Sequence, residues 1–517
     1  MRTLFIFLLF LVLPTGSVMA QEDTVLKTLY SKRFSMGTDG IPRVRVGIHT
    51  GLASVKIFAP TGLQVSSGKG PGITVTGPST YKVTATKTTP ARLRYYISLK
   101  SVPAARTDLF TAAQKAFARA KIKTTIKEQG FIISLRGKVL DTRRFLFSLG
   151  PFSSRARAAV RLKKEAKKHL GAFIHTELVS LPQGTLSASG RGVFVTGVSV
   201  ITFTSASGGG ISVDAGKNPL VYPDIIHVVI GRDGKLTVVN ELSMETYLAG
   251  ILPSELFPSA PMESLKAQAV AARGQVLAKM GTRHHGDPFH LCSRVHCQVY
   301  EGLHKVYART TKAVKETRGM VLFDAQGLPA DTVYHSSSGG HGEHNENVWG
   351  GEPKPYLRGR PDGISWHYTT DADLSGFLLK PPVSFCKAGN KGFRWVVTLA
   401  PSATATLLKK AGIPGRIKSV RVTRRGVSGR ALELRLTTSK KKVTISGELN
   451  IRRLFGGLRS SLFLVSQKGQ SLVFTGAGYG HGVGMSQWGA INRAKAGQSF
   501  TKILRHYYFG TKLIKLF

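Results

Sequence analysis

Residues 241–281 form the most informative segment of the chain and read ELSMETYLAGILPSELFPSAPMESLKAQAVAARGQVLAKMG. Pro261 suits the first turn of a helix, and Glu263 complements the positive end of the helix dipole. Apolar residues then recur at helical spacing, and Gly281 can end the helix. This apolar stripe consists of Leu265, Ala269, Ala272 and Val276. The segment therefore predicts a helix between Pro261 and Gly281.

Glu255 stands just ahead of this predicted helix, between Ile251-Leu252 and Leu256-Phe257. A carboxyl group among apolar neighbours tends to have its pKa raised by desolvation. A general acid that works near neutral pH needs such a raised pKa. Glu255 is therefore a candidate general acid, and an exposed loop glutamate is the alternative interpretation.

The composition indicates a folded protein with an unusual charge. The chain has 517 residues, of which 42% are hydrophobic, and this is enough apolar material for two or three globular units. Lys and Arg number 73 against 28 Asp and Glu, which gives a formal charge of +45. Such an excess of positive charge bears on binding partners and solubility and not on the fold. The expected partners are anionic polymers of the cell envelope or membrane surfaces. A solvated basic surface without a specific partner is the alternative.

The first twenty residues, MRTLFIFLLFLVLPTGSVMA, resemble a cleavable secretory signal. Arg2 precedes an apolar run, and small residues precede Gln21. A membrane anchor is the competing interpretation, but the run is short for a bilayer span. The sequence predicts a signal peptide over residues 1–20 and an exported protein, either secreted or periplasmic, in the cell envelope. Export, together with the absence of RNP-like or zinc-finger spacing, argues against nucleic acid as the partner.

Between residues 43 and 182 the pattern changes from β to mixed α and β. Residues 43–90 alternate as strands do, with Val44, Val46 and Ile48 on one face. Residues 92–182 follow the order β-α-β-β-α-β, with helices expected over 107–122 and 154–170 and with Ser154 as a cap. That order suits two helices packed on one face of a small antiparallel sheet.

The β pattern resumes after the glycine-containing segment 184–190, so residues 92–182 are predicted to be an insertion. We expect an α+β protein in which a β-rich domain, residues 43–90 and 187–517, contains a small βαββαβ unit. The stretch SLGPFSSRARAAVRLKKEAKK, residues 148–168, resembles the SPOR domain at its Gly-Pro-Phe turn and second helix. This resemblance implies binding to peptidoglycan glycan strands. A generic insertion of unknown use is the alternative, because fold alone does not fix function.

Four further motifs occur in an order that resembles the SpoIID/LytB family over about residues 190–517. They are YLAGILPSELFPSAPMESLKAQAVAARGQ (247–275), HCQVYEG (296–302), YHSSSGG (334–340) and GYGHGVGMSQWGA (478–490), the last followed by AGQSFTKILRHYYFGTKL (496–513). The family is known from a sporulation lytic transglycosylase and from amidase-enhancer proteins. The resemblance implies that Glu255 is the catalytic acid/base. Leu256 and Gly274 stand where the family commonly has Met and Thr, but neither change removes a charge or a nucleophile.

The resemblance also implies a reaction, the cleavage of the MurNAc–GlcNAc bond of peptidoglycan with an anhydro-MurNAc end as product. A glycoside hydrolase normally uses two carboxylates. In a lytic transglycosylase the C6 hydroxyl of the sugar attacks, so one glutamate can first donate and then accept a proton. A single Glu255 is therefore enough, and Glu343 and Glu346 are the next candidates for the acid.

Residues 283–300, RHHGDPFHLCSRVHCQVY, contain cysteine and histidine at metal-ligand spacing. Two cysteines and two histidines form a closed set typical of structural zinc. The family resemblance implies zinc here, and the expected ligands are His284, Cys292, His296 and Cys297.

Two alternatives apply to this region. His285 and His290 compete with His284 for the fourth ligand position. Cys292 and Cys297 form a disulfide in the other interpretation, which an oxidising compartment favours, and Cys386 is left unpaired in either case.

Residues 476–490, GAGYGHGVGMSQWGA, contain six glycines, which weaken helices and strands. A tight loop leading into a helix near Ser486 is one explanation. Following the family resemblance, we expect these glycines to let the backbone approach a sugar in a cleft shared with the other motifs. The residues expected to line this cleft are Gln298, Tyr300, His335, Ser336, Ser337, Ser338, His481, Ser486 and Gln487.

The sequence thus favours an exported peptidoglycan lytic transglycosylase that is guided by a SPOR-like module. The alternative is a non-catalytic wall-binding protein that stimulates a partner N-acetylmuramoyl-L-alanine amidase. A zinc-dependent amidase would need an open metal position, and the closed ligand set argues against it.

Overall fold

The computed structural model describes residues 24–31, 34–68, 72–135, 137–166, 168–190, 193–206, 208–216, 218–364 and 370–517. The signal peptide predicted for residues 1–20 lies outside them. Within the described ranges, no helix has the length and apolar character needed to cross a membrane. The chain divides into two compact units. The first unit comprises Met1–Arg94, Thr176–Tyr247 and Arg283–Lys305, and the second Tyr95–His175, Leu248–Thr282 and Val306–Phe517.

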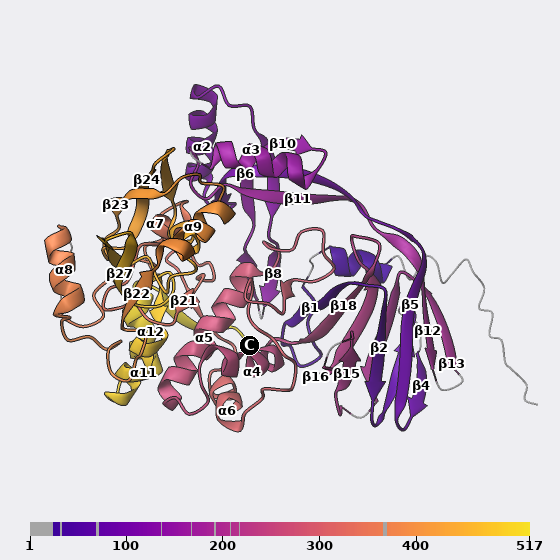
Figure 1. Cartoon of the computed structure of the whole chain (residues 1–517). Coiled ribbons are helices and arrows are strands. Elements are labelled where there is room, and N and C mark those ends of the chain that lie inside the picture. The colour runs from indigo at the N-terminus through magenta and orange to yellow at the C-terminus, as the bar shows by residue number, and fades with distance from the viewer. Residues whose placement is uncertain are drawn as a thin grey trace, which may run out of the picture. The chain divides into compact units, whose positions relative to one another are not determined.

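Two sheets make up most of the first unit (Figure 1). The seven-stranded sheet has the order β19 (Leu291–Cys292), β1 (Arg43–Leu52), β18 (Leu236–Ser243), β17 (Ile225–Ile230), β14 (Val200–Ser205), β3 (Gly62–Ser66) and β4 (Ile73–Thr76). The six-stranded sheet has the order β13 (Val193–Val198), β12 (Gln183–Gly190), β5 (Ser79–Thr89), β2 (Ser54–Ala59), β15 (Ile211–Asp214) and β16 (Leu220–Tyr222).

The two sheets pack against each other through their apolar faces. Tyr81 of β5 meets Phe203 of β14 with ring centroids 6.0 Å apart, and both side chains are fully buried. Val44, Val46 and Ile48, which were predicted to share a face, are all buried in β1. In β2 and the first half of β5 buried and exposed residues alternate, which directs one face of the six-stranded sheet into the core between the two sheets.

The segment 92–182 connects two paired strands of the first unit, because β5 and β12 are antiparallel neighbours. Its sheet has the order β11 (Phe173–Ser180), β6 (Arg92–Pro103), β10 (Arg144–Phe152) and β7 (Thr125–Gln129). Helices α2 (Thr107–Arg119) and α3 (Arg155–Glu165) complete the β-α-β-β-α-β order, and the hairpin β8 (Ile132–Leu135) and β9 (Lys138–Asp141) is an addition to it. We call this segment the inserted unit.

Both helices of the inserted unit are shorter than the sequence predicts. Helix α2 ends at Arg119 because Lys121 takes a left-handed backbone conformation with φ of +53°. Ser154 caps α3 as predicted, since its hydroxyl accepts a hydrogen bond from the backbone N–H of Arg157 at 3.2 Å. The rings of Phe117 and Phe147, 5.4 Å apart, join helix and sheet in the core of this unit.

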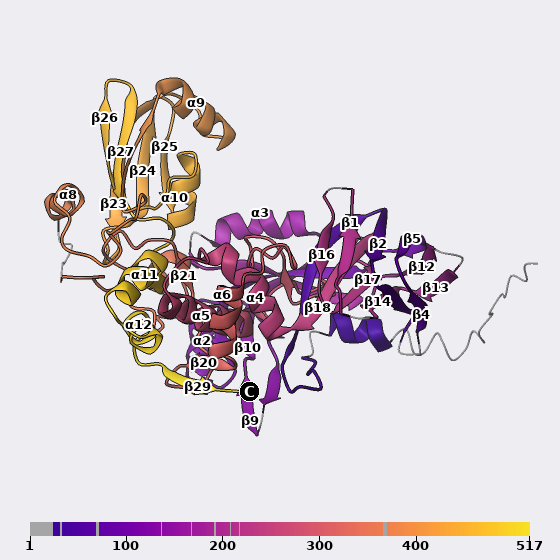
Figure 2. The ribbon, with the colours of Figure 1, turned by 90° about the horizontal axis from the view of Figure 1, so that it is seen from below.

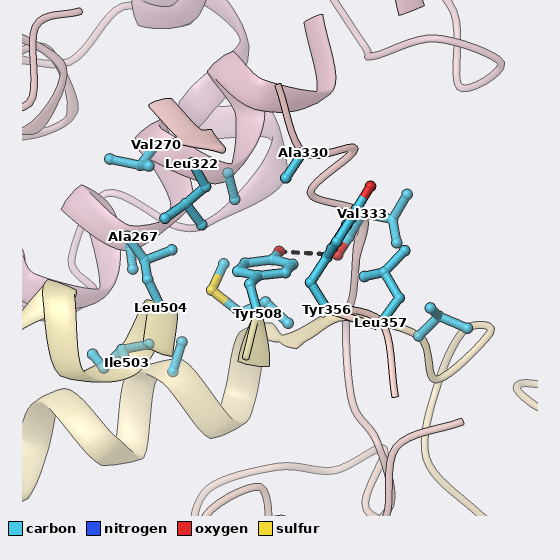
Figure 3. Packing of buried hydrophobic residues seen from close by; sticks show 14 residues of the cluster. Ala267, Val270, Leu322, Ala330, Val333, Tyr356, Leu357, Ile503, Leu504 and Tyr508 are labelled. Atoms are coloured by element: carbon cyan, nitrogen blue, oxygen red, sulfur yellow. Dashed lines mark hydrogen bonds between the residues drawn. The ribbon is translucent and has the colours of Figure 1, made fainter. Parts of the chain in front are cut away.

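In the second unit, α5 (Met262–Lys279) is the helix predicted between Pro261 and Gly281. Three helices contact it, namely α6 (Ala308–Glu316), α11 (Gln487–Lys495) and α12 (Phe500–Tyr507). Figure 3 shows its Ala267 and Val270 in a cluster with Leu504 and Tyr508, whose hydroxyl donates a hydrogen bond to the Val333 carbonyl at 2.9 Å.

More residues of α5 are buried than those of the predicted apolar stripe. Gln268 and Arg273 are fully buried in α5 together with the apolar residues. Arg273 donates a hydrogen bond to the Met320 carbonyl at 3.0 Å. The alanines of α5, together with Ser264 and Gly274, have small side chains and let neighbouring elements approach the helix closely.

The sequence analysis did not predict α4 (Met244–Glu255), which contains Pro253. Ser243 explains its start, because the Ser243 hydroxyl accepts a hydrogen bond from the backbone N–H of Thr246 at 3.0 Å. Glu255 is thus the last residue of a helix, and the chain passes from the first unit to the second within α4.

The remainder of the second unit contains small sheets and short helices (Figure 2). The sheets are β22 (Arg394–Leu399), β27 (Ser471–Ala477) and β26 (Phe463–Lys468); β23 (Ile417–Arg425), β24 (Ala431–Thr438) and β25 (Lys442–Ser446); β20 (Met320–Phe323) with β29 (Lys512–Lys515); and β21 (Tyr334–His335) with β28 (Met485–Ser486). The helices are α7 (Asn345–Trp349), α8 (Asp371–Leu379), α9 (Pro401–Lys410) and α10 (Glu448–Leu454). The predicted α+β fold class is confirmed.

Candidate functional site

Glu255 is half-buried at the C-terminal end of α4. Burial raises the pKa of its carboxyl group above the ordinary range of a glutamate. A hydrogen bond with the Tyr334 side chain and the charge of Lys279 act in the opposite direction but do not cancel this effect. The sequence-based expectation of a raised pKa is therefore confirmed, and the group can hold a proton at a higher pH than an exposed glutamate.

Gln487 fixes the backbone that carries this carboxyl group. Its side-chain amide donates a hydrogen bond to the Glu255 carbonyl oxygen at 2.8 Å and lies 3.4 Å from the amide oxygen of Gln268. Ser486, the residue before it, caps α11 by accepting a hydrogen bond from the backbone N–H of Gly489 at 3.2 Å. Helix α11 therefore begins near Ser486, as predicted, and its first residue holds the end of α4.

A short parallel bridge brings the motif at 334–340 against the motif at 478–490. Tyr334 pairs with Met485 and His335 pairs with Ser486. This approach requires glycine at 484, where φ is +70° and a Cβ would lie 2.0 Å from the Val333 carbonyl oxygen. The close approach that the glycine-rich stretch permits is thus an approach to the protein's own backbone.

Two histidines from these motifs lie with their rings 5.4 Å apart, in an edge-to-face arrangement. The Nδ1 of His335 donates to the Val483 carbonyl at 3.0 Å, and the Nδ1 of His481 accepts from the Val483 N–H at 3.1 Å. His481 also hydrogen-bonds to the Tyr334 carbonyl. Burial lowers the pKa of His335 well below its ordinary range and that of His481 to about 3. Both imidazoles are therefore neutral near pH 7, and neither is a strong proton donor there.

The predicted serines lie beside these histidines and differ in exposure. The buried Ser337 hydroxyl accepts a hydrogen bond from Asn390 at 2.8 Å, and the buried Ser338 hydroxyl donates to the Cys386 sulfur at 3.2 Å. Ser336 is half-exposed, and its carbonyl accepts from the backbone N–H of Trp488. Of the three hydroxyls, only that of Ser336 belongs to a residue with substantial exposure.

Gln298 and Tyr300 belong to the first unit, whereas Glu255 and the other predicted substrate-binding residues belong to the second. The amide oxygen of Gln298 accepts a hydrogen bond from the Tyr247 hydroxyl at 3.2 Å. The Tyr300 hydroxyl donates to the side-chain oxygen of Asn240 at 2.7 Å. Both predicted residues are buried and use their polar groups within the first unit.

The two alternative acids are engaged within the fold. Glu343 is buried, and its carboxylate accepts hydrogen bonds from the Ser428 hydroxyl at 2.6 Å and the Asn347 amide at 2.9 Å. Glu346 forms a two-pronged ion pair with Arg358. Partial burial opposes ionisation of Glu346, but the Arg358 guanidinium outweighs it and lowers the pKa. The environment of Glu255 raises its pKa, whereas that of Glu346 lowers it.

The predicted metal ligands gather in the first unit. The donor atoms of His284, Cys292, His296 and Cys297 all lie within 4.8 Å of one another. The His284 Nε2 is 3.2 Å from the Cys297 sulfur, and the His296 Nδ1 is 3.7 Å from the Cys292 sulfur and 3.5 Å from the Cys297 sulfur. A tetrahedral zinc ion with bonds of about 2.0 to 2.3 Å separates its donors by roughly 3.3 to 3.8 Å. The donor set therefore fits zinc in both chemistry and spacing.

The alternative residues for this cluster lie in different surroundings. His290 is 2.8 Å from the Arg45 guanidinium instead, and all three cysteines are free thiols. The other ring nitrogen of His284 faces the Asp287 carboxylate at 3.3 Å, the usual outer partner of a metal-bound histidine. His284 lies with His296 and the two cysteines, and its role as the fourth metal ligand stays a prediction.

Sequence reasoning did not single out three residues that shape this site. Tyr334 stood in a quoted motif without an assigned role. Trp349 lies 4.8 Å from the His481 ring, and the buried guanidinium of Arg430 donates to the carbonyls of Ser338 and His341. For Tyr334 the sequence offered one signal, its position directly before His335. Trp349 and Arg430 offered none, because their contacts are with segments distant in sequence.

The raised pKa of Glu255 predicts how the Glu255→Gln substitution changes stability with pH. Folding raises this pKa, so the stability that the group contributes is full below the unfolded pKa of about 4.3 and is lost as the pH rises through the folded pKa. Glutamine does not ionise. We expect the melting temperature of Glu255→Gln minus that of the wild type to increase from pH 4 upward, as thermal unfolding at a series of pH values would measure.

Glu316→Gln is the matched control, because Glu316 lies on the surface of α6 and its hydrogen bond to Lys266 lowers its pKa. Its melting temperature relative to the wild type should not increase with pH. A flat or falling difference for Glu255→Gln would show that the Glu255 carboxyl is not destabilised by burial.

Comparisons with known proteins agree with the motif order. The family model described as Stage II sporulation protein, SpoIID, matches residues 232–323, and a model described as a domain of unknown function matches residues 343–484. The first match contains Glu255 and the four clustered cysteine and histidine residues. The second contains Trp349, Arg430 and His481.

Three relatives extend the similarity over about half of the chain. An uncharacterised protein of Brachyspira hyodysenteriae is 30% identical over 54% of this chain and 68% of its own length. The amidase enhancer of Bacillus subtilis is 32% identical over 52% of this chain and 40% of its own length. The stage II sporulation protein D of Bacillus amyloliquefaciens is 28% identical over 58% of this chain and 81% of its own length. With the motif order, the SpoIID match and these relatives in agreement, the chain belongs to the SpoIID/LytB family.

Proposed function

We propose that this protein is an exported peptidoglycan lytic transglycosylase with Glu255 as its single acid/base. The observation that carries the proposal is the half-buried Glu255 carboxyl with its raised pKa, on a residue whose backbone carbonyl accepts a hydrogen bond from Gln487. Membership of a family that includes proteins named for sporulation and for amidase enhancement supports a role at the cell wall. Peptidoglycan glycan strands are the proposed substrate.

In this mechanism the protonated Glu255 donates its proton to the glycosidic oxygen as the bond from that oxygen to C1 of MurNAc breaks. The C6 hydroxyl of the same MurNAc then attacks C1, and the Glu255 carboxylate takes the hydroxyl proton. One glycosidic bond is exchanged for the internal 1,6-bond, so no water is consumed. The hydrogen bond of Glu255 with Tyr334 would favour the carboxylate form in the second step.

Glu255→Gln tests this role directly. The amide keeps the shape of a protonated carboxyl but cannot transfer the proton, so release of anhydro-muropeptides should fall about 100-fold to 10,000-fold. Mass spectrometry of the products from purified glycan strands, with and without prior amidase treatment, measures this. Sacculus binding should be unchanged, and Glu316→Gln should retain full activity.

Two outcomes would contradict the proposal in different ways. Near-normal activity of Glu255→Gln would place the acid elsewhere. Failure of the wild type to produce anhydro ends, even from amidase-treated glycan, would favour the second candidate function, stimulation of a partner amidase. The similarity to the amidase enhancer supports that candidate, although the aligned part covers only 40% of that protein.

We also propose that the cluster of His284, Cys292, His296 and Cys297 binds structural zinc. When bound, the ion would cross-link the segment 284–297 and, with all four positions taken by protein ligands, would supply no site for activating water. Asp287 would orient His284.

Protein purified without chelator should contain about one zinc ion per chain by elemental analysis. Cys297→Ser should lose the zinc and lower the melting temperature, because structural zinc contributes folding free energy. Cys386→Ser, which removes the one cysteine outside the cluster, should keep the zinc. Metal-free native protein with a disulfide between Cys292 and Cys297 would contradict the assignment.

The inserted unit is a proposed glycan-binding module of the SPOR type. Its sheet order supports the proposal, as does the basic sequence of α3, RARAAVRLKKE. In the full chain, replacing Arg157, Arg161 and Lys164 by alanine should weaken sedimentation with amidase-treated sacculi and leave the melting temperature within a few degrees, since these side chains are on the surface. Unchanged sedimentation would contradict this role for α3.

A further inference from the structure

Trp349 is an exposed tryptophan beside the residues of the candidate site. It is the last residue of α7, and 43% of its surface is accessible. Its ring lies 4.8 Å from the His481 ring, with the two planes inclined at 60°. Tryptophan usually buries much of its large apolar surface, so an exposed ring next to a candidate site calls for an explanation.

A short series of contacts links Trp349 to the proposed acid. His481, on which the indole packs, hydrogen-bonds to the backbone carbonyl of Tyr334. The Tyr334 side chain in turn hydrogen-bonds with the Glu255 carboxyl group. Two residues therefore separate the indole from the acid, and all of them belong to the second unit. This places an open aromatic surface within a few sugar rings of the reacting bond.

The position of Trp349 is fixed from several directions. Arg358 holds α7 through its ion pair with Glu346 and a hydrogen bond to the side-chain oxygen of Asn345 at 2.6 Å. The inserted unit packs against the turn that follows, since a Cβ at Gly171 would lie 2.6 Å from the Trp349 carbonyl oxygen.

An ion pair also ties the inserted unit to this turn, with Lys100 of β6 at 2.8 Å from Glu352. The exposed indole is thus held in place by the contacts of the surrounding backbone and by the His481 ring, on which it packs.

A second exposed aromatic residue adjoins the acid. Phe257 follows Glu255 by two residues, is 42% exposed, and packs on Trp488 with ring centroids 6.0 Å apart. Trp488 comes directly after Gln487, which holds the Glu255 carbonyl. Glu255 is contacted by Tyr334 and by Gln487, and an exposed aromatic ring lies near each of these contacts: Trp349 near the first and Phe257 near the second. Such an arrangement is typical of an extended ligand site and not of an isolated surface residue.

We infer that Trp349 is a stacking platform for a pyranose ring of the glycan strand, at a position next to the sugar that Glu255 protonates. The inference rests on the proposed function for the identity of the substrate. The face of a pyranose presents C–H groups with partial positive charge, which match the negative face of an indole. Because the indole is already held in place, little conformational freedom is lost when the sugar binds. Trp349 thereby positions the strand and takes no part in proton transfer.

The test uses full-length Glu255→Gln protein, which binds without turnover, and a peptide-free tetrasaccharide of alternating GlcNAc and MurNAc. The chain has four tryptophans, so binding can be followed by intrinsic fluorescence as well as by calorimetry. Adding Trp349→Ala should weaken binding about tenfold, and Trp349→Phe should weaken it less, because phenylalanine keeps an aromatic face. Trp349→Phe should also remove most of the fluorescence change.

Phe509→Ala is the matched control. Phe509 is 56% exposed, and its ring packs on the Arg360 guanidinium. It should leave tetrasaccharide binding unchanged. Melting temperatures of all variants establish that they are folded, as expected for changes at exposed side chains.

The outcomes separate this inference from the proposed function. If Trp349→Ala binds the tetrasaccharide as tightly as its parent, the stacking platform is wrong whatever the enzyme does. If the wild type yields no anhydro ends but binding still depends on Trp349, the transglycosylase proposal fails and the platform stands. If Trp349→Ala impairs only the stimulation of an amidase, the exposed indole is a protein-docking residue and the inference is overturned.

Discussion

The candidate site depends on a backbone contact between two segments that are about 150 residues apart. The chain at Tyr334–His335 pairs with the chain at Met485–Ser486, and this pairing is possible because Gly484 leaves room beside the Val333 carbonyl. From this contact Ser486 starts α11, and Gln487 reaches the end of α4. The position of Glu255 therefore depends on the motif at residues 478–490, which lies more than 200 residues later in the sequence.

Burial determines the charge state of this site. Desolvation favours the protonated form of Glu255 and the neutral forms of His335 and His481. The buried Arg430 guanidinium adds to the effect on both histidines, because a nearby positive charge disfavours imidazolium. Burial thus acts in the same direction on all three groups, because it disfavours the charged form of each.

The cysteine and histidine cluster lies on a segment with little regular structure. Its ligands lie on the segment 284–297, which contributes only the two-residue strand β19 to the seven-stranded sheet. Strand β19 pairs with Val46 and Gly47 of β1, so a sheet edge supports the middle of the segment. The rest has little regular structure, and a metal with four protein ligands is a common way to hold such a loop in place.

Several features could be predicted from the sequence because they depend on local patterns. Pro261 and Gly281 bounded α5, Ser154 capped α3, and the alternation at Val44, Val46 and Ile48 marked a buried strand face. The apolar neighbours of Glu255 correctly predicted a raised pKa.

Local patterns failed where contacts from distant segments decide the outcome. Helix α4 was not predicted, because it contains Pro253 and its apolar residues do not form a one-sided stripe. Ser337, Ser338 and Ser486 were expected to line a cleft, and the local pattern did not predict that their hydroxyls form hydrogen bonds within the protein. The sequence by itself determined the family, the bounds of α5 and the cap of α3, because these depend on residue order and immediate neighbours. Only the tertiary structure decided which histidines lie beside Cys292 and Cys297, which serines are buried and which aromatic rings are exposed, because each of these depends on the segments that pack around it.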